Sequence, residues 1–496
     1  MFVAALDLGT GGLHIELYSP DGIVLSSAYQ ELQYQTGSLA GTLEFDPESL
    51  FRVSMQCLSE VIRKGAVGKN EKMTIAVTGQ RHGSVFLDAD YRPVLSVVNL
   101  DGRVDKHFLS RMQRDNENIY ATTGRAAGEI FPAVRMAWMC THQPDVYRRI
   151  HSFAMISEWL CFRLTGILRG ERTNSLESLL MDIHIGQWSE ELLSLFGLSH
   201  LDLPELVDPG SCVSTILPDV ASTYGIPGDT IVSLSAADTQ CAVIGSEATE
   251  DGDVVVVNGS TTPVVMVTNV LHSDPQQTTW SDLHVDDTFL IESNGGRTGI
   301  VYRETTRLLA CQALPEAVPE EIFNVHKMKM TAHFLPDPTG HVTFHDVPQS
   351  VWFQGELTDL LTYLPYLILE NNAFSIAAKI LELVRVRGSG VKRIYLTGGS
   401  SRSVLTQTIL SSLHHNQEVF LTPTFDTTTR GAALLAWRTC ATNYQGAIPD
   451  APGKLDHQEL SLHRNYRPDD FSDVVHERFH QWRHSFVAGS GKKDDD

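Results

Sequence analysis

The sequence has little positive charge, no clustered cysteines and no long apolar run. Its 38 lysines and arginines stand against 60 aspartates and glutamates, which gives a net charge of −22. Non-specific nucleic-acid binding needs cationic side chains that displace counterions, so this balance argues against a nucleic-acid partner. It does not argue against an anionic nucleotide, because local backbone N–H donors can hold phosphates against a repulsive mean charge.

The seven cysteines are scattered along the chain and never form a CxxC pair. Disulfide frameworks and zinc sites both need clustered spacing, so we expect a protein of the reducing cytoplasm. Asp7 interrupts the start too early for the core of a signal peptide. No run approaches the ~20 apolar residues of a membrane span, and we expect no membrane partner.

Two nucleotide-binding motifs are also missing. No segment matches GxxxxGK[ST], which excludes a P-loop phosphotransferase. A GxGxxG fingerprint starting at Gly9 fails because His14 stands where the third glycine belongs. The 496 residues are too many for one core, and the 42% hydrophobic share is that of an ordinary globular protein. We therefore expect two large domains, followed by a disordered charged tail, GSGKKDDD.

The most informative stretch lies in the middle of the chain. A short apolar strand at residues 231–234 ends in small residues and then Asp238. A second strand at 254–257 ends in the turn Asn-Gly-Ser-Thr-Thr at 258–262. Ligands of α/β proteins bind at strand ends, where a carboxylate can take a proton and a Gly-Ser-Thr turn can donate to phosphate. The pattern predicts a general base facing a phosphate cradle.

The beginning of the chain has a related arrangement. A buried strand at residues 3–7 runs into Leu-Gly-Thr-Gly-Gly at 8–12, and strands at 13–18 and 23–30 complete a meander. A tight turn needs only one glycine, so Asp7 followed by this turn favours phosphate binding. Both halves thus begin with a strand–turn–strand unit, and two such turns could grip one polyphosphate.

Two further strand-end loops carry polar side chains. Gln80 and His82 follow the strand at 73–78 and offer directional hydrogen bonds that suit a polyhydroxyl ligand. Asp101 and Arg103 lie in a later loop and, taken alone, would be read as a surface salt bridge. The helical pattern from 105 to 180 indicates only core packing.

In the second half, a Gly-rich turn at 294–299 precedes a helix, which suits an anion or ribose. A long helix at 357–387 leads to a strand at 393–397 that ends in Gly-Gly-Ser-Ser, and a helix follows at 403–413. The small residues at 431–436 indicate either close approach to a purine or tight helix packing. The polar segment 315–348 receives no assignment.

These motifs together resemble the FGGY carbohydrate kinases of the actin-like ATPase superfamily, most nearly the xylulokinase branch. LDLGTGG and VVNGSTTPVV are similar to the two phosphate motifs, and GQRHG with LDGR to the sugar-contacting pair. SAADTQ resembles the motif of the catalytic base, with Ala237 in place of the usual glycine, and LTGGSSRS with DTTTRGAALLA resembles the adenosine motif and closing helix. The motifs run in family order from residue 3 to 437. GTLEFDP, LDGR and MISEWL also resemble the autoinducer kinases.

The resemblance implies an α/β fold of two actin-like (ribonuclease H-like) domains, each a mixed sheet flanked by helices, with a cleft between them. We expect the domains at residues 1–245 and 246–440, the second binding most of the ATP, and an extension at 441–496. Asp238 would be the catalytic base and Asp7 would hold Mg²⁺, in part through water. The sugar ligands would be Gln80, His82, Asp101, Arg103 and Asp238 itself. The nucleotide ligands would be Asp7, Gly9, Thr10, Gly11, Gly259, Ser260, Thr261, Gly299, Gly398 and Gly399.

The resemblance does not choose the acceptor. D-xylulose, another pentulose, a hexulose, a polyol such as glycerol and the autoinducer all offer hydroxyls that these residues could hold. Two other classes are a sugar-binding regulator that has lost catalysis and a chaperone-type ATPase. Intact Asp7 and Asp238 argue against the first, and the roughly sixty residues after Ala436 are too few and too polar for the peptide-binding domain of the second. The sequence does not show the oligomeric state, although a homodimer is common in the family.

Overall fold

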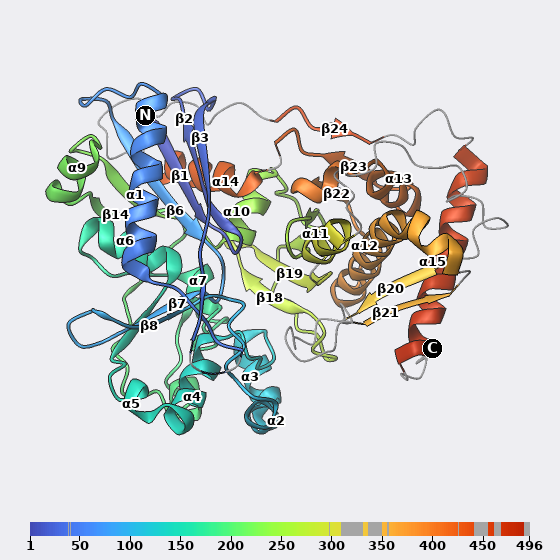
Figure 1. Ribbon diagram of the computed structural model, residues 1–496, viewed down its shortest axis with the longest axis horizontal. Helices are drawn as coiled ribbons and strands as arrows, with labels where there is room; N and C mark the ends of the chain where they lie inside the picture. The colour runs from blue at the N-terminus through green and yellow to red at the C-terminus, as the bar shows by residue number, and fades with distance from the viewer. Residues whose placement is uncertain are drawn as a thin grey trace. The chain divides into compact units, whose positions relative to one another are not determined.

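The chain forms two compact units in the computed structural model (Figure 1). The structure describes residues 1–496 except 38, 40, 297, 309–330, 336–349, 355–356, 425, 441–454, 461–467 and 491–496. Unit 1 comprises Met1–Glu247, Asn269–Leu290 and Asp426–Lys454, and unit 2 comprises Ala248–Thr268, Ile291–Phe425 and Leu455–Asp496. The first stretch of unit 1 ends close to the boundary expected at residue 245, but two later segments return to the same unit.

Unit 1 is built on a six-stranded mixed sheet in the order β14-β15-β6-β1-β2-β3. Its strands are β1 (Phe2–Leu8), β2 (Gly12–Tyr18), β3 (Val24–Glu31), β6 (Met73–Gly79), β14 (Ser211–Thr215) and β15 (Ile231–Leu234). The predicted meander is present, because β1, β2 and β3 pair antiparallel. Both β1 and β15 run parallel to β6, so the carboxyl ends of these three strands share one edge.

Helices cover both faces of this sheet. They are α1 (Pro47–Lys64), α6 (Ile156–Thr165), α10 (Asp238–Gly245) and α14 (Thr427–Cys440). Ala4, Leu6 and Leu8 pack with the residues of α1 and α6, whereas the alternate residues Val3 and Ala5 pack with α10 and α14. Figure 1 shows α14, from late in the chain, beside β1. The two-residue period of a strand therefore points Asp7 towards the face of α10 and α14.

The helix α1 begins where its sequence predicts. Asp46 is the N-cap and its carboxylate accepts from the backbone N–H groups of Glu48 and Ser49, with Pro47 at the first helical position. A proline is well placed there because its missing N–H would have no helical partner. Six buried apolar residues of α1 then join the core of the sheet.

The small residues of α14 serve helix packing. A Cβ on Gly431 would lie 1.8 Å from the Cys241 carbonyl oxygen of α10, and one on Gly245 would lie 1.9 Å from the Thr427 carbonyl oxygen. No side chain fits at such distances, so the two helices can approach only through these glycines. Of the two alternatives for residues 431–436, the described contacts match tight helix packing.

A five-stranded sheet in the order β4-β5-β8-β7-β9 completes unit 1 with several short elements. Its strands are β4 (Gln35–Thr36), β5 (Leu43–Glu44), β7 (Ser84–Leu87), β8 (Pro93–Val97) and β9 (Ser152–Met155). The short helices are α2 (Lys106–Met112), α3 (Asn116–Thr123), α4 (Pro132–His142), α5 (Pro144–Tyr147), α7 (Arg172–Leu176), α8 (Glu190–Leu195) and α9 (Pro218–Tyr224).

The second large sheet repeats the plan of the first, in the order β18-β19-β17-β16-β22-β23-β24. Its strands are β16 (Val254–Val257), β17 (Pro263–Thr268), β18 (Trp280–Leu283), β19 (Phe289–Asn294), β22 (Arg393–Thr397), β23 (Glu418–Leu421) and β24 (Gln458–Glu459). A hairpin, β16–β17, is again followed by a parallel neighbour, β22, on the other side of its first strand. The expected echo between the halves is thus present in the topology.

Helices of unit 2 pack against this sheet. They are α11 (Thr298–Leu308), α12 (Leu357–Arg387), α13 (Val404–Leu413) and α15 (Pro468–Ser490). The core joins valines of β16 to apolar residues of α12, α13 and α15. A separate hairpin pairs β20 (Thr331–Leu335) with β21 (Ser350–Gln354). Most of the unassigned segment 315–348, and the end of the predicted charged tail, lie outside the described residues.

One covalent link contradicts the reading of the cysteines. Cys212 of β14 and Cys440, the last residue of α14, form a disulfide with Cα atoms 5.9 Å apart. The two residues are 228 positions apart in the sequence, so spacing along the chain could not reveal the pair. Among the described helices, none has the length and apolar character needed to cross a membrane.

Candidate active site

The predicted catalytic residues gather at one edge of the six-stranded sheet. The register pairs Leu8 of β1 with Gly79 of β6, and Leu234 of β15 with Val77 of β6. The three strands therefore end side by side. The turn after β1, the Gln-Arg-His segment after β6 and Asp238 after β15 consequently emerge at the same edge.

Asp7 is a half-buried carboxylate that feels the charge of other acids. Burial raises its pKa well above the usual range, and the charges of Asp426 and Asp238 raise it further. Its Oδ1 is buried and has no hydrogen-bond partner among the residues that the structure describes. A divalent cation would relieve this repulsion and supply the missing partner.

The donors at this edge suit magnesium better than a metal held by protein ligands alone. No group of three or more His, Cys, Asp or Glu side chains within the described ranges is arranged to hold a metal ion. Magnesium keeps several waters and needs only one or two carboxylates beside substrate phosphates. The orphaned oxygen of Asp7 fits that requirement.

Asp426 was not among the predicted site residues, although its charge raises the pKa of Asp7. It hydrogen-bonds Nδ1 of His14, and its Oδ1 accepts from the backbone N–H of Thr429 at 3.0 Å. Burial alone would raise the pKa of Asp426, but the hydrogen bond and charge of His14 outweigh it and lower the pKa. An acid directly before the Thr-Thr-Thr start of a helix is a capping signal that could have identified it.

Asp238 is the first residue of α10 and remains accessible. Its side chain is 29% exposed, and Asp7 is likewise only partly buried, although the Oδ1 atom of Asp7 is shielded from solvent. The backbone N–H of Thr239 donates to its Oδ1 at 2.7 Å, and Arg81 Nε lies 3.6 Å from the same oxygen. A carboxylate with this exposure can reach a substrate hydroxyl, which a fully buried one cannot.

His82 and Arg81 belong to a buried network that the sequence reading missed. His82 Nε2 lies 2.9 Å from Glu177 Oε2, and Arg81 Nη1 lies 3.2 Å from Glu177 Oε1. Burial lowers the pKa of His82 to about 4, against the opposing effect of Glu177, so the imidazole is neutral near pH 7. His82 also has a φ of 67°, which is uncommon for a non-glycine residue, and Arg135 Nη1 donates to its carbonyl at 2.9 Å.

Gln80 supports the first phosphate turn. Its Oε1 accepts from the backbone N–H of Asn99 at 3.0 Å, and its Nε2 lies 3.5 Å from the carbonyl oxygen of Gly9. Asn99 Nδ2 donates to the hydroxyl of Thr10 at 2.8 Å, and the Tyr34 hydroxyl donates to the Thr10 carbonyl at 2.7 Å. The expected sugar contact of Gln80 stays a prediction, because the described bonds of its amide hold the turn.

Asp101 and Arg103 form an ion pair, but a buried one. Arg103 Nε lies 2.7 Å from Asp101 Oδ1, and both side chains are 0% exposed. The backbone N–H of Leu43 donates to Asp101 at 2.8 Å, and Arg103 also contacts Glu44 at 3.0 Å. The surface salt bridge read from the loop alone is therefore wrong. The bonds hold residues 43–44 to the loop, and a direct sugar contact stays a prediction.

The predicted nucleotide residues of unit 2 converge at the matching edge of its own sheet. Val257 of β16 pairs with Thr397 of β22, so the turn after β16 lies beside Gly398. A Cβ on Gly299 would lie 2.0 Å from the Gly259 carbonyl oxygen, and one on Gly398 would lie 2.5 Å from the Asn258 carbonyl oxygen. Gly398 also has a φ of +87°. Glycine is thus required at both positions for the turn, the start of α11 and the strand end to meet.

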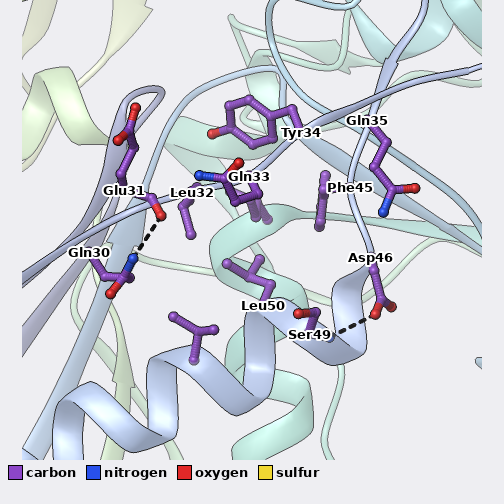
Figure 2. Close-up of a pocket in the computed structure, with 12 residues that line it drawn as sticks. Gln30, Glu31, Leu32, Gln33, Tyr34, Gln35, Phe45, Asp46, Ser49 and Leu50 are labelled. Carbon is purple, nitrogen blue, oxygen red and sulfur yellow. Dashed lines mark hydrogen bonds between the residues drawn. The ribbon is translucent and has the colours of Figure 1, made fainter.

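Two cavities of unit 1 do not include the predicted sugar ligands. Figure 2 shows one of about 200 Å³ between residues 30–35 and the start of α1, with Tyr34, Phe45 and Leu50 around it. Another, of about 510 Å³, is lined by Thr173, His284 and the end of α14. Neither contains Asp7, Arg81, His82 or Asp238.

Comparison with known proteins gives a consistent result. Residues 2–245 match the FGGY family of carbohydrate kinases, N-terminal domain. YoaC of Bacillus subtilis (strain 168), which is assigned to the sugar kinases, is 31% identical over 64% of this chain and 64% of its own length. The autoinducer-2 kinase of Salmonella typhimurium is 25% identical over 52% of this chain and 50% of its own. The xylulose kinase of B. subtilis is 28% identical over 51% of this chain and 50% of its own length. In each case the match covers less than two thirds of the relative.

Solved structures share the fold over nearly the whole chain. The xylulose kinase of Rhodospirillum rubrum has a TM-score of 0.80 and 20% identity, covering 98% of this chain and 99% of its own. The glycerol kinase of Plasmodium falciparum with ADP has a TM-score of 0.74 and 17% identity, covering 97% and 98%. The expected two-domain actin-like α/β fold is confirmed.

Proposed function

This chain belongs to the FGGY family of carbohydrate kinases through its N-terminal domain at residues 2–245, and on that premise we propose that it is an ATP-dependent sugar kinase. It transfers the γ-phosphate to a hydroxyl of a ketopentose, with D-xylulose as the first-choice acceptor and D-xylulose 5-phosphate as the product. The observation that carries the proposal is the placement of Asp238, whose side chain is 29% exposed, and of Asp7, whose buried Oδ1 has no hydrogen-bond partner among the described residues, at the ends of two strands that both pair with β6.

Asp238 acts as the general base. It takes the proton of the acceptor hydroxyl while that oxygen bonds to the γ-phosphorus, and the bond to the β-phosphate oxygen breaks to release ADP. Phosphoryl transfer is accelerated mainly by positioning and by neutralisation of charge. Thr239 and Arg81 contribute the positioning, since both contact Asp238 Oδ1. His82 binds the acceptor as a neutral hydrogen-bonding group.

The glycine-rich turns bind the nucleotide. Gln80 and Tyr34 bind carbonyl oxygens of the turn at Gly9 to Gly11, and Asn99 binds the Thr10 hydroxyl. The backbone N–H groups of the turn bind phosphate oxygens. In unit 2, Gly259 to Thr261 supply a second such turn, with Gly299, Gly398 and Gly399 beside the nucleotide. Asp7 holds Mg²⁺, which when bound neutralises charge on the transferred phosphoryl group.

The relatives support more than one acceptor. The xylulose kinase of B. subtilis supports a pentulose, and the autoinducer-2 kinase matches a similar share of the chain. A catalytically silent sugar-binding regulator is the alternative from another class. It has no need for three carboxylates whose charges act on one another, which is what Asp238, Asp7 and Asp426 provide.

An ADP-release assay over an acceptor panel tests the proposal. The panel contains D-xylulose, D-ribulose, a hexulose, glycerol and autoinducer-2, each with MgATP. We expect D-xylulose to give the highest kcat/KM. Turnover of a different acceptor would correct the substrate, whereas no turnover with any acceptor, together with sugar binding by calorimetry, would favour the regulator. Cytoplasmic location and a homodimer remain predictions of this proposal.

A further inference from the structure

Glu177 is a buried carboxylate on which three cationic or hydrogen-donating side chains converge. It follows the short helix α7 and has 0% side-chain exposure. Arg81 Nη1 lies 3.2 Å from its Oε1, Arg125 Nη2 lies 3.0 Å from the same oxygen, and His82 Nε2 lies 2.9 Å from its Oε2. These contacts hold the pKa of Glu177 well below its usual range although burial alone would raise it.

Arg125 fixes the carboxylate in place. Its Nε also lies 3.2 Å from Glu177 Oε2, so the two groups form a bidentate pair. Arg125 itself donates to the carbonyl oxygens of Thr123 at 3.1 Å and Ser281 at 2.9 Å, and it pairs with Asp282. A bidentate guanidinium restricts the orientation of its partner. Glu177 therefore presents Arg81 and His82 with an acceptor that cannot rotate away.

The opposite end of α7 contacts the loop of the predicted base. The backbone N–H of Ala237 donates to the hydroxyl of Thr173 at 2.9 Å, and that hydroxyl lies 2.7 Å from Glu171 Oε2. Ala237 immediately precedes Asp238. One helix of five residues thus holds the backbone before Asp238 at one end and the side chain of Arg81 at the other.

We propose that Glu177 is a positioning residue for the acceptor site: it holds Arg81 against Asp238 and fixes the ring of His82 for binding an acceptor hydroxyl. The inference rests on the proposed kinase function and adds to it a residue that does not itself touch substrate. Its two effects, on Arg81 and on His82, follow from separate oxygens of the same carboxylate.

The effect on His82 is to select a tautomer. A charged Glu177 can only accept, so His82 Nε2 carries the proton. The neutral ring then leaves the lone pair on Nδ1, which no described residue hydrogen-bonds. An acceptor hydroxyl can donate to that lone pair. Without Glu177 the ring loses the interaction that chooses between its two tautomers.

The effect on Arg81 is to hold its guanidinium in place. The guanidinium lies 3.2 Å from Glu177 Oε1 and 3.6 Å from Asp238 Oδ1. Without the charge of Glu177, Arg81 loses the contact that keeps it beside Asp238. The orientation of the Asp238 carboxylate is then less restricted, which makes it a poorer acceptor of the hydroxyl proton. The loss falls on acceptor binding and phosphoryl transfer, not on ATP binding.

Steady-state kinetics of Glu177→Gln test the inference. We expect kcat/KM for the acceptor to fall about 100-fold, with the acceptor KM rising about tenfold and the ATP KM within twofold of the parent. The matched control is Glu370→Gln, at a buried carboxylate of unit 2 that is likewise held by two nitrogens of one arginine, since Arg478 Nε and Nη2 each lie 2.6 Å from its oxygens. The control should change neither KM. A merely structural Glu177 would give equal losses for acceptor and ATP.

Glu177→Asp covers the case in which the Gln variant does not fold. It keeps the charge but withdraws the carboxylate by one methylene, so the acceptor KM should rise at least threefold and the ATP KM should not. If the parent is active and either Glu177→Gln or Glu177→Asp keeps the parental kcat/KM for the acceptor, the inference is wrong but the proposed function stands. A parent without turnover on any acceptor would overturn the proposed function, and the inference with it.

Discussion

Arg81 Nε lies 3.6 Å from Asp238 Oδ1, and the backbone N–H of Thr239 donates to that same oxygen at 2.7 Å. Both interactions favour one orientation of the carboxylate. An oriented and 29% exposed carboxylate is suited to accept a proton from a bound hydroxyl.

Replacing Asp238 by asparagine should abolish most of the turnover. An amide keeps the size of the side chain but cannot take the proton, and general-base catalysis contributes roughly 10² to 10⁴-fold. We expect kcat in the ADP-release assay to fall at least 100-fold and ATP affinity by calorimetry to stay within twofold. Asp90→Asn, at an exposed carboxylate that is not among the predicted site residues, is the control. Turnover within tenfold of the parent would show that the base is misassigned.

Local signals predicted the framework of this site well. The strand ends at Leu234 and Val257 and the helix start at Pro47 are all written in short runs of neighbouring residues. The echo between the halves follows from two hairpins whose turns are rich in glycine, and the structure places each beside a parallel strand. Such features depend on interactions within a few residues, which a single sequence contains.

The buried charges could not be predicted in this way. Glu177 meets Arg125 and His82 across 52 and 95 positions of sequence, and nothing near it distinguishes it from a surface glutamate. The helical reading of residues 105–180 as core packing therefore passed over it. The same limit applies to the amide of Gln80, whose direction depends on Asn99. Folding, not local pattern, decides which polar groups meet.

Replacing His82 by alanine should impair acceptor binding. The ring lies in the buried network and offers its Nδ1 to a hydroxyl, so its loss removes a hydrogen bond worth about 1 kcal/mol and disturbs Arg81. We expect the acceptor KM to rise about tenfold while the ATP KM stays constant. His200→Ala, at an exposed histidine, should change neither value. Equal increases in both KM values would contradict the placement of His82 at the acceptor.

The pH dependence of stability should contain a contribution from Glu158. Burial raises its pKa from 4.5 to about 7, although backbone N–H groups of Met155 and Glu171 lower it. The folded chain therefore holds a proton that the unfolded chain releases between pH 4.5 and about 7. This contribution is fully present below pH 4.5, and the free energy of unfolding from this group decreases as pH rises to about 7.

Urea unfolding at several pH values measures this effect. The amide side chain introduced by Glu158→Gln cannot titrate. The free energy of unfolding should therefore decrease between pH 5 and 7.5 by about 1 to 3 kcal/mol less in the variant than in the parent. Asp90→Asn, at an exposed side chain, should keep the parental slope. If the free energy of unfolding depends on pH in the same way in Glu158→Gln and in the parent, Glu158 is ionised in the folded protein at neutral pH.

The disulfide between Cys212 and Cys440 should stabilise unit 1. It joins β14 to the last residue of α14, and α14 crosses α10, whose first residue is Asp238. Cross-links stabilise mainly by restricting the unfolded chain, and loops of this length contribute about 2 to 5 kcal/mol. A dithiol reductant, or Cys212→Ser, should therefore lower the free energy of unfolding by that amount. Cys140→Ser, at an exposed cysteine outside the disulfide, should leave it unchanged. Thiol titration of the denatured protein should find two more thiols after reduction than before. An equal thiol count would show that the two cysteines are reduced in the isolated protein, and the stabilisation would then come from packing of α14 alone.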